Sequence, residues 1–210
     1  MNDESVLSAR PRAVVSLSGG MDSAVCLALA ARDYDVYALH FGYGQRTEKR
    51  ELASARAVAE HFGVQQFLPL KLELFRLIGG SALTDPNIAV PNAPATRKIG
   101  EEIPVTYVPF RNAHFLSAAV SWAEVLGAKI IFIGAVEQDG SGYPDCRPAY
   151  YAAFNQVIRT GTRNGDIEVL TPLIHLKKKR NHSARHGIEC PISSHLVLLF
   201  RRGAGLRSLR

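Results

Sequence analysis

The chain has 210 residues, 47% of them hydrophobic, which is enough for one globular α/β domain with a buried core. It has no apolar run of about 18 residues and no signal-peptide pattern at its start, so we expect no membrane span and no secretion. The three cysteines, Cys26, Cys146 and Cys190, are too few for a disulfide framework, and we expect a cytoplasmic protein.

The net charge of +6 comes from the end of the chain. Residues 1–176 carry a net charge of −2, whereas residues 177–210 carry +8, with Glu189 as their single acid. A nucleic-acid-binding domain usually carries its positive charge on the folded surface, so this distribution argues against nucleic acid as a partner. We predict a domain over residues 12–176 and a basic, poorly ordered tail over residues 177–210.

Predicted strands and helices alternate along the domain. Apolar, β-branched runs predict strands at residues 12–17, 36–41, 66–70 and 129–134. Apolar residues at helical spacing predict helices at residues 24–31, 47–62, 112–126 and 149–160, the first with Asp22 or Ser23 as its N-cap. This alternation predicts a parallel sheet with right-handed crossovers. Residues 79–107 carry four prolines and predict a long irregular loop that is a lid, a binding loop or disordered.

A glycine-rich string, Ser18-Gly19-Gly20-Met21-Asp22-Ser23, joins the first predicted strand to the first predicted helix. Its glycines let the backbone approach a ligand closely, and successive N–H groups at a helix N-terminus attract phosphate. Ser18 and Ser23 can offer hydroxyls, and Asp22 can cap the helix or help hold Mg²⁺. A tight turn that needs glycine is the simpler alternative, but the full string after a buried strand favours phosphate binding. It lacks the lysine of a Walker loop.

This string resembles the phosphate loop of the ATP pyrophosphatase superfamily, which includes NAD synthetases, GMP synthetases and tRNA-thiolating enzymes. Its members cleave ATP to AMP and pyrophosphate through an adenylated oxygen. The resemblance implies an adenine nucleotide alpha hydrolase-like α/β fold, with a doubly wound, mostly parallel sheet and ATP at the carboxyl ends of the strands. It implies ATP and Mg²⁺ as cofactors and Ser18, Asp22 and Ser23 as catalytic residues. The implied nucleotide-binding stretch is Leu17, Ser18, Gly19, Gly20, Met21, Asp22, Ser23, Ala24, Val25, Cys26 and Leu27.

Three further segments narrow the resemblance. They are residues 41–46, where a crevice would open after the second strand, residues 108–116, and residues 134–148 with the string Tyr143-Pro144-Asp145-Cys146-Arg147. Together they make residues 13–176 similar to the 7-cyano-7-deazaguanine synthase family of queuosine precursor synthesis. That family converts 7-carboxy-7-deazaguanine and ammonia to a nitrile through an adenylated carboxylate and an adenylated amide.

For the deazaguanine and its carboxylate, we predict contacts from Tyr143, Asp145 and Arg147, with Arg111 and Glu137 nearby. Arginine can donate two parallel hydrogen bonds to a carboxylate, and a carboxylate side chain suits the N–H-rich edge of a guanine-like base. The alternatives are a surface salt bridge for Arg111 and plain turn chemistry for Tyr143. Adenylation needs no thiol nucleophile, so Cys146 is expected to be a loop or buried thiol.

The C-terminal segment departs from the family. Family members end in four cysteines that bind a structural zinc, whereas this chain has only Cys190 after Leu176. His182, His186, Cys190 and His195 could supply four ligands, but Pro191 would break the helix that aligns the first three. We expect no metal site, and a reading-frame change near Lys178 is the simplest explanation.

Two other functions stay open from the sequence. Another ATP pyrophosphatase, such as a tRNA thiolase, would commonly need a pair of catalytic cysteines. A catalytically impaired remnant would keep the nucleotide fold without the zinc lobe. The sequence leaves the oligomeric state open, with a homodimer as one option.

Overall fold

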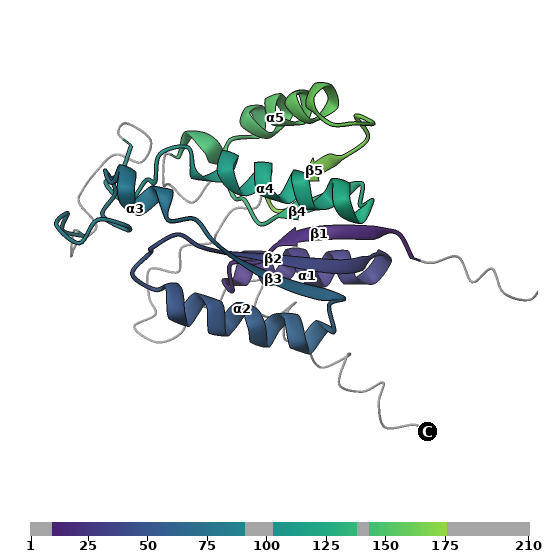
Figure 1. The fold of residues 1–210 in the computed structure, drawn as a ribbon, viewed down its shortest axis with the longest axis horizontal. Helices are drawn as coiled ribbons and strands as arrows, with labels where there is room; N and C mark the ends of the chain where they lie inside the picture. The colour runs from purple at the N-terminus through teal and green to yellow at the C-terminus, as the bar shows by residue number, and fades with distance from the viewer. Residues whose placement is uncertain (1–9, 91–102, 138–142, 176–210) are drawn as a thin grey trace, which may run out of the picture.

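The computed structural model describes residues 10–90, 103–137 and 143–175, and all structural statements refer to these residues. Within them, one parallel sheet has the strand order β3-β2-β1-β4-β5 (Figure 1). The strands are β1 (Arg12–Ser16), β2 (Asp35–Gly42), β3 (Gln66–Lys71), β4 (Ile130–Ile133) and β5 (Glu168–Leu170). The helices are α1 (Met21–Asp33), α2 (Glu48–Phe62), α3 (Leu74–Ile78), α4 (Arg111–Leu126), α5 (Pro148–Gly161) and the 3₁₀ turn η1 (Pro144–Cys146).

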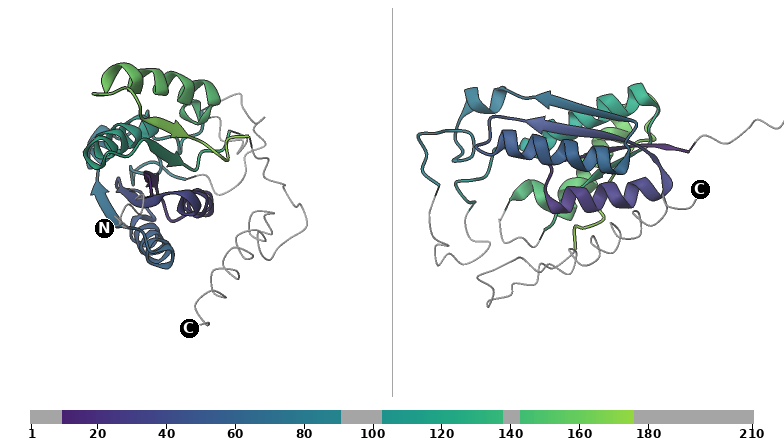
Figure 2. Two further views of the ribbon diagram at one scale, coloured as in Figure 1. Left: turned by 90° about the vertical axis from the view of Figure 1, so that its right-hand side faces the viewer. Right: turned by 90° about the horizontal axis from the view of Figure 1, so that it is seen from below.

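The central strand β1 is buried on both faces, and its side chains divide between two hydrophobic clusters. Ala13 and Val15 pack with residues of α1 and α2, whereas Val14 packs with residues of α4 and α5. Accordingly, α1 and α2 cover one face of the sheet and α4 covers the other, with α5 beside it (Figures 1 and 2). The predicted doubly wound, parallel α/β fold is confirmed.

The strand order reverses at β1, which places the candidate site at the carboxyl end of this central strand. From β1 the chain passes through α1 to β2 on one side, and β4 pairs with β1 on the other side. Ser16 therefore lies in register with Leu39 of β2 and with Ile133 of β4. In open α/β sheets, the crevice beyond the carboxyl ends of the strands at such a reversal is the usual ligand site.

The predicted elements and the structure differ in particular places. The prediction of Asp22 or Ser23 as the N-cap of the first helix is wrong, because α1 begins at Met21 and its N-cap is Gly20. The Ser23 side chain lies inside the first turn and donates back to the carbonyl of Gly20. The short elements α3, η1 and β5 were not predicted.

The predicted irregular loop is confirmed at residues 79–90 and 103–107, where the structure has no helix or strand. No helix of the described residues is both long and apolar enough to cross a membrane. The predicted tail at residues 177–210 lies outside the described residues, so the division into domain and tail stays a prediction.

Candidate active site

The glycine loop turns the chain sharply from β1 into α1, against the side of α2. Gly19 has φ +84°, and a Cβ there would lie 2.5 Å from the carbonyl oxygen of Glu51 and 2.8 Å from the nitrogen of Ala55. Neither backbone atom can move without displacing α2, so only glycine fits at this position. The hydroxyl of Ser54 also donates to the carbonyl of Gly19 over 2.7 Å, which ties the loop to α2.

Two serine hydroxyls hold the loop in shape. Ser23 Oγ donates to the carbonyl of Gly20 over 2.8 Å and accepts from the N–H of Ser18 over 3.2 Å. Ser18 Oγ accepts from the N–H of Gly20 over 3.2 Å and lies 3.1 Å from Ser23 Oγ. Because the Ser23 proton is used at Gly20, the Ser18 hydroxyl is the donor between the two oxygens. The serines therefore preform the loop.

A buried histidine on β2 contacts the backbone just before the glycine loop. His40 on β2 is 1% exposed, and its Nδ1 donates to the carbonyl of Leu17 over 2.9 Å. A carbonyl can only accept, so Nδ1 carries a proton. The N–H of Leu17 donates in turn to the carbonyl of Leu39. These two bonds together hold Leu17, the residue just before the glycine loop, against β2.

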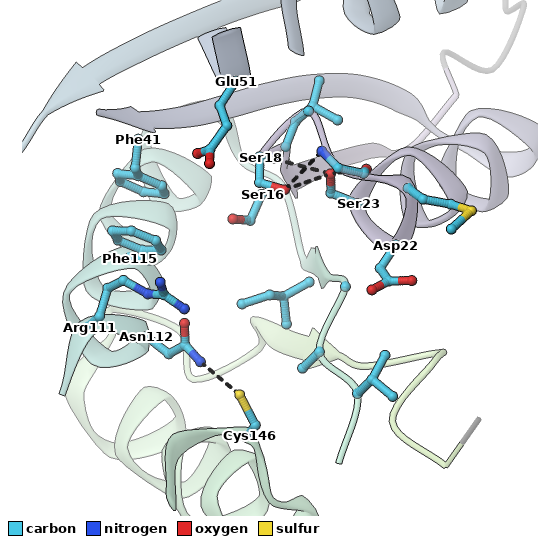
Figure 3. A pocket seen from close by; sticks show the side chains of 18 of the residues that line it. Ser16, Ser18, Asp22, Ser23, Phe41, Glu51, Arg111, Asn112, Phe115 and Cys146 are labelled. Carbon is cyan, nitrogen blue, oxygen red and sulfur yellow. Dashed lines mark hydrogen bonds between the residues drawn. The ribbon is translucent and has the colours of Figure 1, made fainter. Parts of the chain in front are cut away.

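A cavity of about 1080 Å³ opens beside this loop, at the carboxyl ends of β1, β2 and β4. Figure 3 shows Ser18, Asp22 and Ser23 on one side and Arg111, Asn112 and Cys146 on the opposite side. Phe41 and Phe115 close one end, with their rings stacked 4.1 Å apart. A cavity with a phosphate-type loop facing a positive side chain is suited to a ligand with anionic groups.

The structure divides the predicted site residues into those that line the cavity and those that do not. From the predicted nucleotide stretch, residues 17–23 line it, whereas Ala24, Val25, Cys26 and Leu27 continue into α1 beyond the cavity wall. From the predicted substrate set, Arg111 and Tyr143 line it, and Glu137, Asp145 and Arg147 do not. The roles of all these residues stay proposals.

Like Arg50, Arg111 places a positive charge in the cavity wall. Its Nη1 donates to the hydroxyl of Tyr43 over 3.0 Å, and its guanidinium carbon lies 5.3 Å from the Tyr43 ring centroid and 5.6 Å from that of Phe115. Desolvation lowers the pKa of Arg111, but Tyr43 and the Asp145 carboxylate raise it, and the net shift is upward. Its buried Nε has no hydrogen-bond partner in the part of the chain that the structure describes. Arg111 is therefore a charged donor in the cavity wall, not a surface ion-pair residue.

Asp145 holds the helix that carries Arg111. It is 3% exposed, and its Oδ2 accepts from the backbone N–H of Asn112 over 3.1 Å, at the start of α4. The Asn112 side-chain amide donates back to the carbonyl of Asp145 over 2.9 Å. The N-cap of α4, Phe110, makes no side-chain cap, so Asp145 satisfies the helix end from 33 residues away. Oδ1 of Asp145 has no hydrogen-bond partner among the described residues, so the predicted contact of this side chain with a base stays a prediction.

The two described cysteines differ in their surroundings. Cys26 is fully buried on α1, and burial raises the pKa of its thiol to about 12, which leaves it unreactive. Cys146 lines the cavity, and its sulfur accepts from the Asn112 amide over 3.6 Å (Figure 3). Of these two cysteines only Cys146 could serve a thiolase, which argues against a catalytic pair within the described residues.

No group of three or more histidine, cysteine, aspartate or glutamate side chains that could hold a metal occurs in the part of the chain that the structure describes. The alternative ligand set in the tail, from His182 to His195, lies outside the described residues.

Several cavity residues were not singled out from the sequence. Arg50, Glu51 and Ser54 reach the cavity from α2, and Tyr151 reaches it from α5. No local pattern marks the α2 residues, because they come close to the loop only through the packing of α2 on the sheet. Tyr151 carried a weak signal, since an adjacent aromatic pair follows the string at Tyr143–Arg147.

These features define a class. In a parallel α/β sheet, a preformed glycine loop joins the central strand to the following helix, beside a cavity at the reversal of strand order. This is the architecture of a phosphate-binding α/β protein. The chain belongs to the queuosine biosynthesis protein QueC family, whose model matches residues 12–196. The match runs past residue 176, the limit given by the sequence motifs.

Curated relatives are similar over most of their length. The 7-cyano-7-deazaguanine synthase of Acidobacterium capsulatum is 71% identical over 171 residues, which cover 81% of this chain and 75% of the relative. That of Koribacter versatilis is 63% identical over 170 residues, covering 80% of this chain and 71% of the relative. That of Chlorobium chlorochromatii is 53% identical over 180 residues, covering 85% and 77%.

Proposed function

We propose that this chain converts 7-carboxy-7-deazaguanine and ammonia to 7-cyano-7-deazaguanine in the cytoplasm, with cleavage of ATP to AMP and pyrophosphate. The observation that carries the proposal is the preformed glycine loop facing Arg111 across one cavity, in a chain whose relatives are named for this product. The loop suits the phosphates of one reactant, and the guanidinium suits the carboxylate of the other.

The chemistry needs two activations. In the first, a carboxylate oxygen attacks the α-phosphorus of ATP, the bond to the β-phosphate breaks, and pyrophosphate leaves. Ammonia then attacks the acyl carbon and loses a proton, and AMP departs with the carboxylate oxygen, which gives the amide. In the second, the amide oxygen is adenylated in the same way. The nitrogen then loses its two protons as the C–O bond to AMP breaks, which leaves the nitrile.

The protein supplies positioning and charge stabilisation for both steps. On the loop side, Ser18, Gly19, Gly20 and Ser23 would bind the departing pyrophosphate through N–H and hydroxyl groups. Asp22 lines the cavity on the first turn of α1, and its carboxylate suits the Mg²⁺ that accompanies ATP and offsets the phosphate charge.

On the opposite side, Arg111 would orient the carboxylate of the acid, and Tyr143, which also lines the cavity, would contact the same ligand. Asp145 would act mainly by holding the start of α4, and thereby the backbone that presents Arg111. Glu137 and Arg147 do not line the cavity, so their proposed contacts with the acid have less support.

Product analysis tests the proposal. The purified full chain is incubated with ATP, Mg²⁺, ammonium and 7-carboxy-7-deazaguanine, and all products are identified by mass. We expect the nitrile with two AMP and two pyrophosphate for each nitrile formed. ADP and phosphate as the nucleotide products, or no product from the acid, would contradict the proposal. An Asp22→Ala preparation serves as the control for activity carried over from the expression host.

A further inference from the structure

Two adjacent tyrosines at the start of α5 differ in one respect. Tyr150 and Tyr151 both have a buried hydroxyl oxygen without a hydrogen-bond partner among the described residues. Tyr151 is 3% exposed and lines the cavity, whereas Tyr150 is not part of the cavity wall. Buried polar atoms in native proteins nearly always have partners, so an orphan hydroxyl on a residue that lines a cavity points to a ligand.

The surroundings of Tyr151 decide what that ligand must offer. Burial raises the pKa of the Tyr151 phenol, the nearby Cys146, Asp145 and Tyr150 raise it further, and Arg111 lowers it by less. The hydroxyl therefore keeps its proton at any working pH and is available as a donor. Arg111, which also lines the cavity, has a buried Nε that can only donate and that has no partner within residues 10–90, 103–137 and 143–175. This wall presents two unused donors, and it calls for oxygen acceptors.

We propose that Tyr151, together with Arg111 Nε, binds the acceptor oxygens of the heterocyclic acid, which makes Tyr151 a determinant of substrate recognition. The inference rests on the proposed function, because it takes 7-carboxy-7-deazaguanine as the ligand. That acid carries two kinds of acceptor oxygen, in its carboxylate and in its ring carbonyl. The ring carbons that carry these two groups lie close to each other in the fused ring. The phosphate loop on the opposite wall remains for ATP.

The adjacent tyrosines provide a matched pair of variants. Tyr151→Phe and Tyr150→Phe each remove one buried, unpartnered oxygen and no carbon, so both should fold and melt like the original chain. Binding of 7-carboxy-7-deazaguanine is measured by calorimetry without turnover. We expect Tyr151→Phe to weaken it about tenfold, as the loss of one hydrogen bond to a charged or polarised oxygen would. Tyr150→Phe should stay within about twofold, and ATP should bind equally well to all three proteins.

A second ligand identifies the acceptor. 7-Deazaguanine keeps the ring carbonyl but lacks the carboxylate. If Tyr151→Phe weakens its binding as well, the hydroxyl contacts the ring carbonyl, and if only the acid is affected, it contacts the carboxylate. Either result supports the inference.

Three results would overturn it: unchanged binding of both ligands to Tyr151→Phe, an equal loss in Tyr150→Phe, or a loss of ATP binding in place of acid binding. A failure of the proposed function gives a different experimental result. If the unmodified chain binds no acid at all, the proposed function fails and takes the inference with it. If the unmodified chain binds the acid and Tyr151→Phe binds it as well, only the inference fails.

Discussion

The guanidinium of Arg111 donates to the hydroxyl of Tyr43 over 3.0 Å, which joins the start of α4 to the segment after β2 across 68 residues of sequence. The Tyr43 backbone is held in turn, because its N–H donates to Gln45 Oε1 over 2.8 Å. Gln45 Nε2 donates to the Glu51 carboxylate of α2 over 2.8 Å. The position of the cationic group in the cavity is therefore fixed by three elements on both faces of the sheet.

Replacing Arg111 with lysine tests this arrangement. Lysine keeps the charge but offers one compact ammonium, which cannot donate to Tyr43 and to a carboxylate in the fixed geometry of the guanidinium. We expect Arg111→Lys to raise KM for the acid by about 10- to 100-fold, with KM for ATP unchanged. Steady-state kinetics with each substrate varied in turn provides the measurement, and an equal rise in both KM values would contradict the assigned role.

The same kinetics on Arg147→Lys tests the sequence-based assignment of Arg147, an exposed residue outside the cavity wall. Unchanged use of the acid by that variant would remove Arg147 from the substrate set.

A close backbone approach links the end of β4 to the first turn of α1. A Cβ at Gly134 would lie 2.8 Å from the carbonyl carbon of Asp22 and 2.9 Å from the nitrogen of Ser23. Gly134→Ala must therefore push α1 and its loop away from β4. We expect it to lower stability by about 1–3 kcal/mol, as overpacking does, and to weaken ATP binding about tenfold or more.

Gly161→Ala is the matched control for that change. Gly161 is the last residue of α5, and a Cβ there would meet nothing within 4 Å. This variant should bind ATP normally and be as stable as the original chain or more so, by up to about 1 kcal/mol. Thermal unfolding and ATP titration of both variants provide the check. Normal ATP binding by Gly134→Ala would mean that the loop does not need its present position.

The sequence predicts the long strands and helices of this fold better than its short elements. The strands at residues 12–17 and 129–134 could be predicted because they are buried on both faces and read as continuous apolar runs. The three-residue strand β5 and the five-residue helix α3 carry too few residues for a periodic pattern. The α1 boundary was misplaced because Ser23, a good N-cap by type, is used to close the loop.

The candidate site shows the same division. Its phosphate loop is contiguous in the sequence, so a single string predicts it. The opposite wall is assembled from α4, α5 and η1, and its contacts join residues far apart in the chain. The capping of α4 by Asp145, across 33 residues, could not be foreseen from local composition. Tyr151 depends on the same packing, because nothing in the string around it says which of two adjacent tyrosines turns to the cavity.

The buried thiol of Cys26 makes stability depend on alkaline pH. Burial, with a smaller contribution from the Asp22 charge, raises its pKa from 9.0 to about 12. Above pH 9 the unfolded chain releases the Cys26 proton while the folded chain keeps it, so unfolding becomes more favourable as pH rises. Stability is fully present below pH 9 and falls up to pH 12, by as much as about 1.4 kcal/mol for each pH unit.

Other groups also titrate in that range, so the comparison must be with Cys26→Ala. We expect the urea-unfolding free energy of the original chain to fall more steeply with pH than that of Cys26→Ala between pH 9 and pH 11. The absolute stability of the variant is irrelevant, since only the two slopes are compared. Parallel slopes would show that Cys26 ionises alike in the folded and unfolded chains.

The last prediction concerns zinc, whose expected ligands fall in residues 177–210, outside the described residues. The two described cysteines are committed elsewhere, Cys26 to the core and Cys146 to the cavity, which leaves Cys190 as the single thiol available to a structural site. A four-thiolate zinc site therefore cannot form within one chain. Metal analysis of the purified chain should find well under one zinc per chain, and a tightly held, stoichiometric zinc would defeat this prediction.

Two explanations of the missing cysteines compete. The jump in net charge from −2 to +8 near Lys178 favours a reading-frame change, whereas the family match up to residue 196 favours an inherited tail. Translating the encoding DNA in the other two frames after the Lys178 codon decides between them, because a frame change must yield a C-x-x-C-x-x-C cluster in one of them. If neither frame contains that cluster, the tail is the segment with which this chain evolved, and its stability must come without the folding energy that a structural zinc contributes.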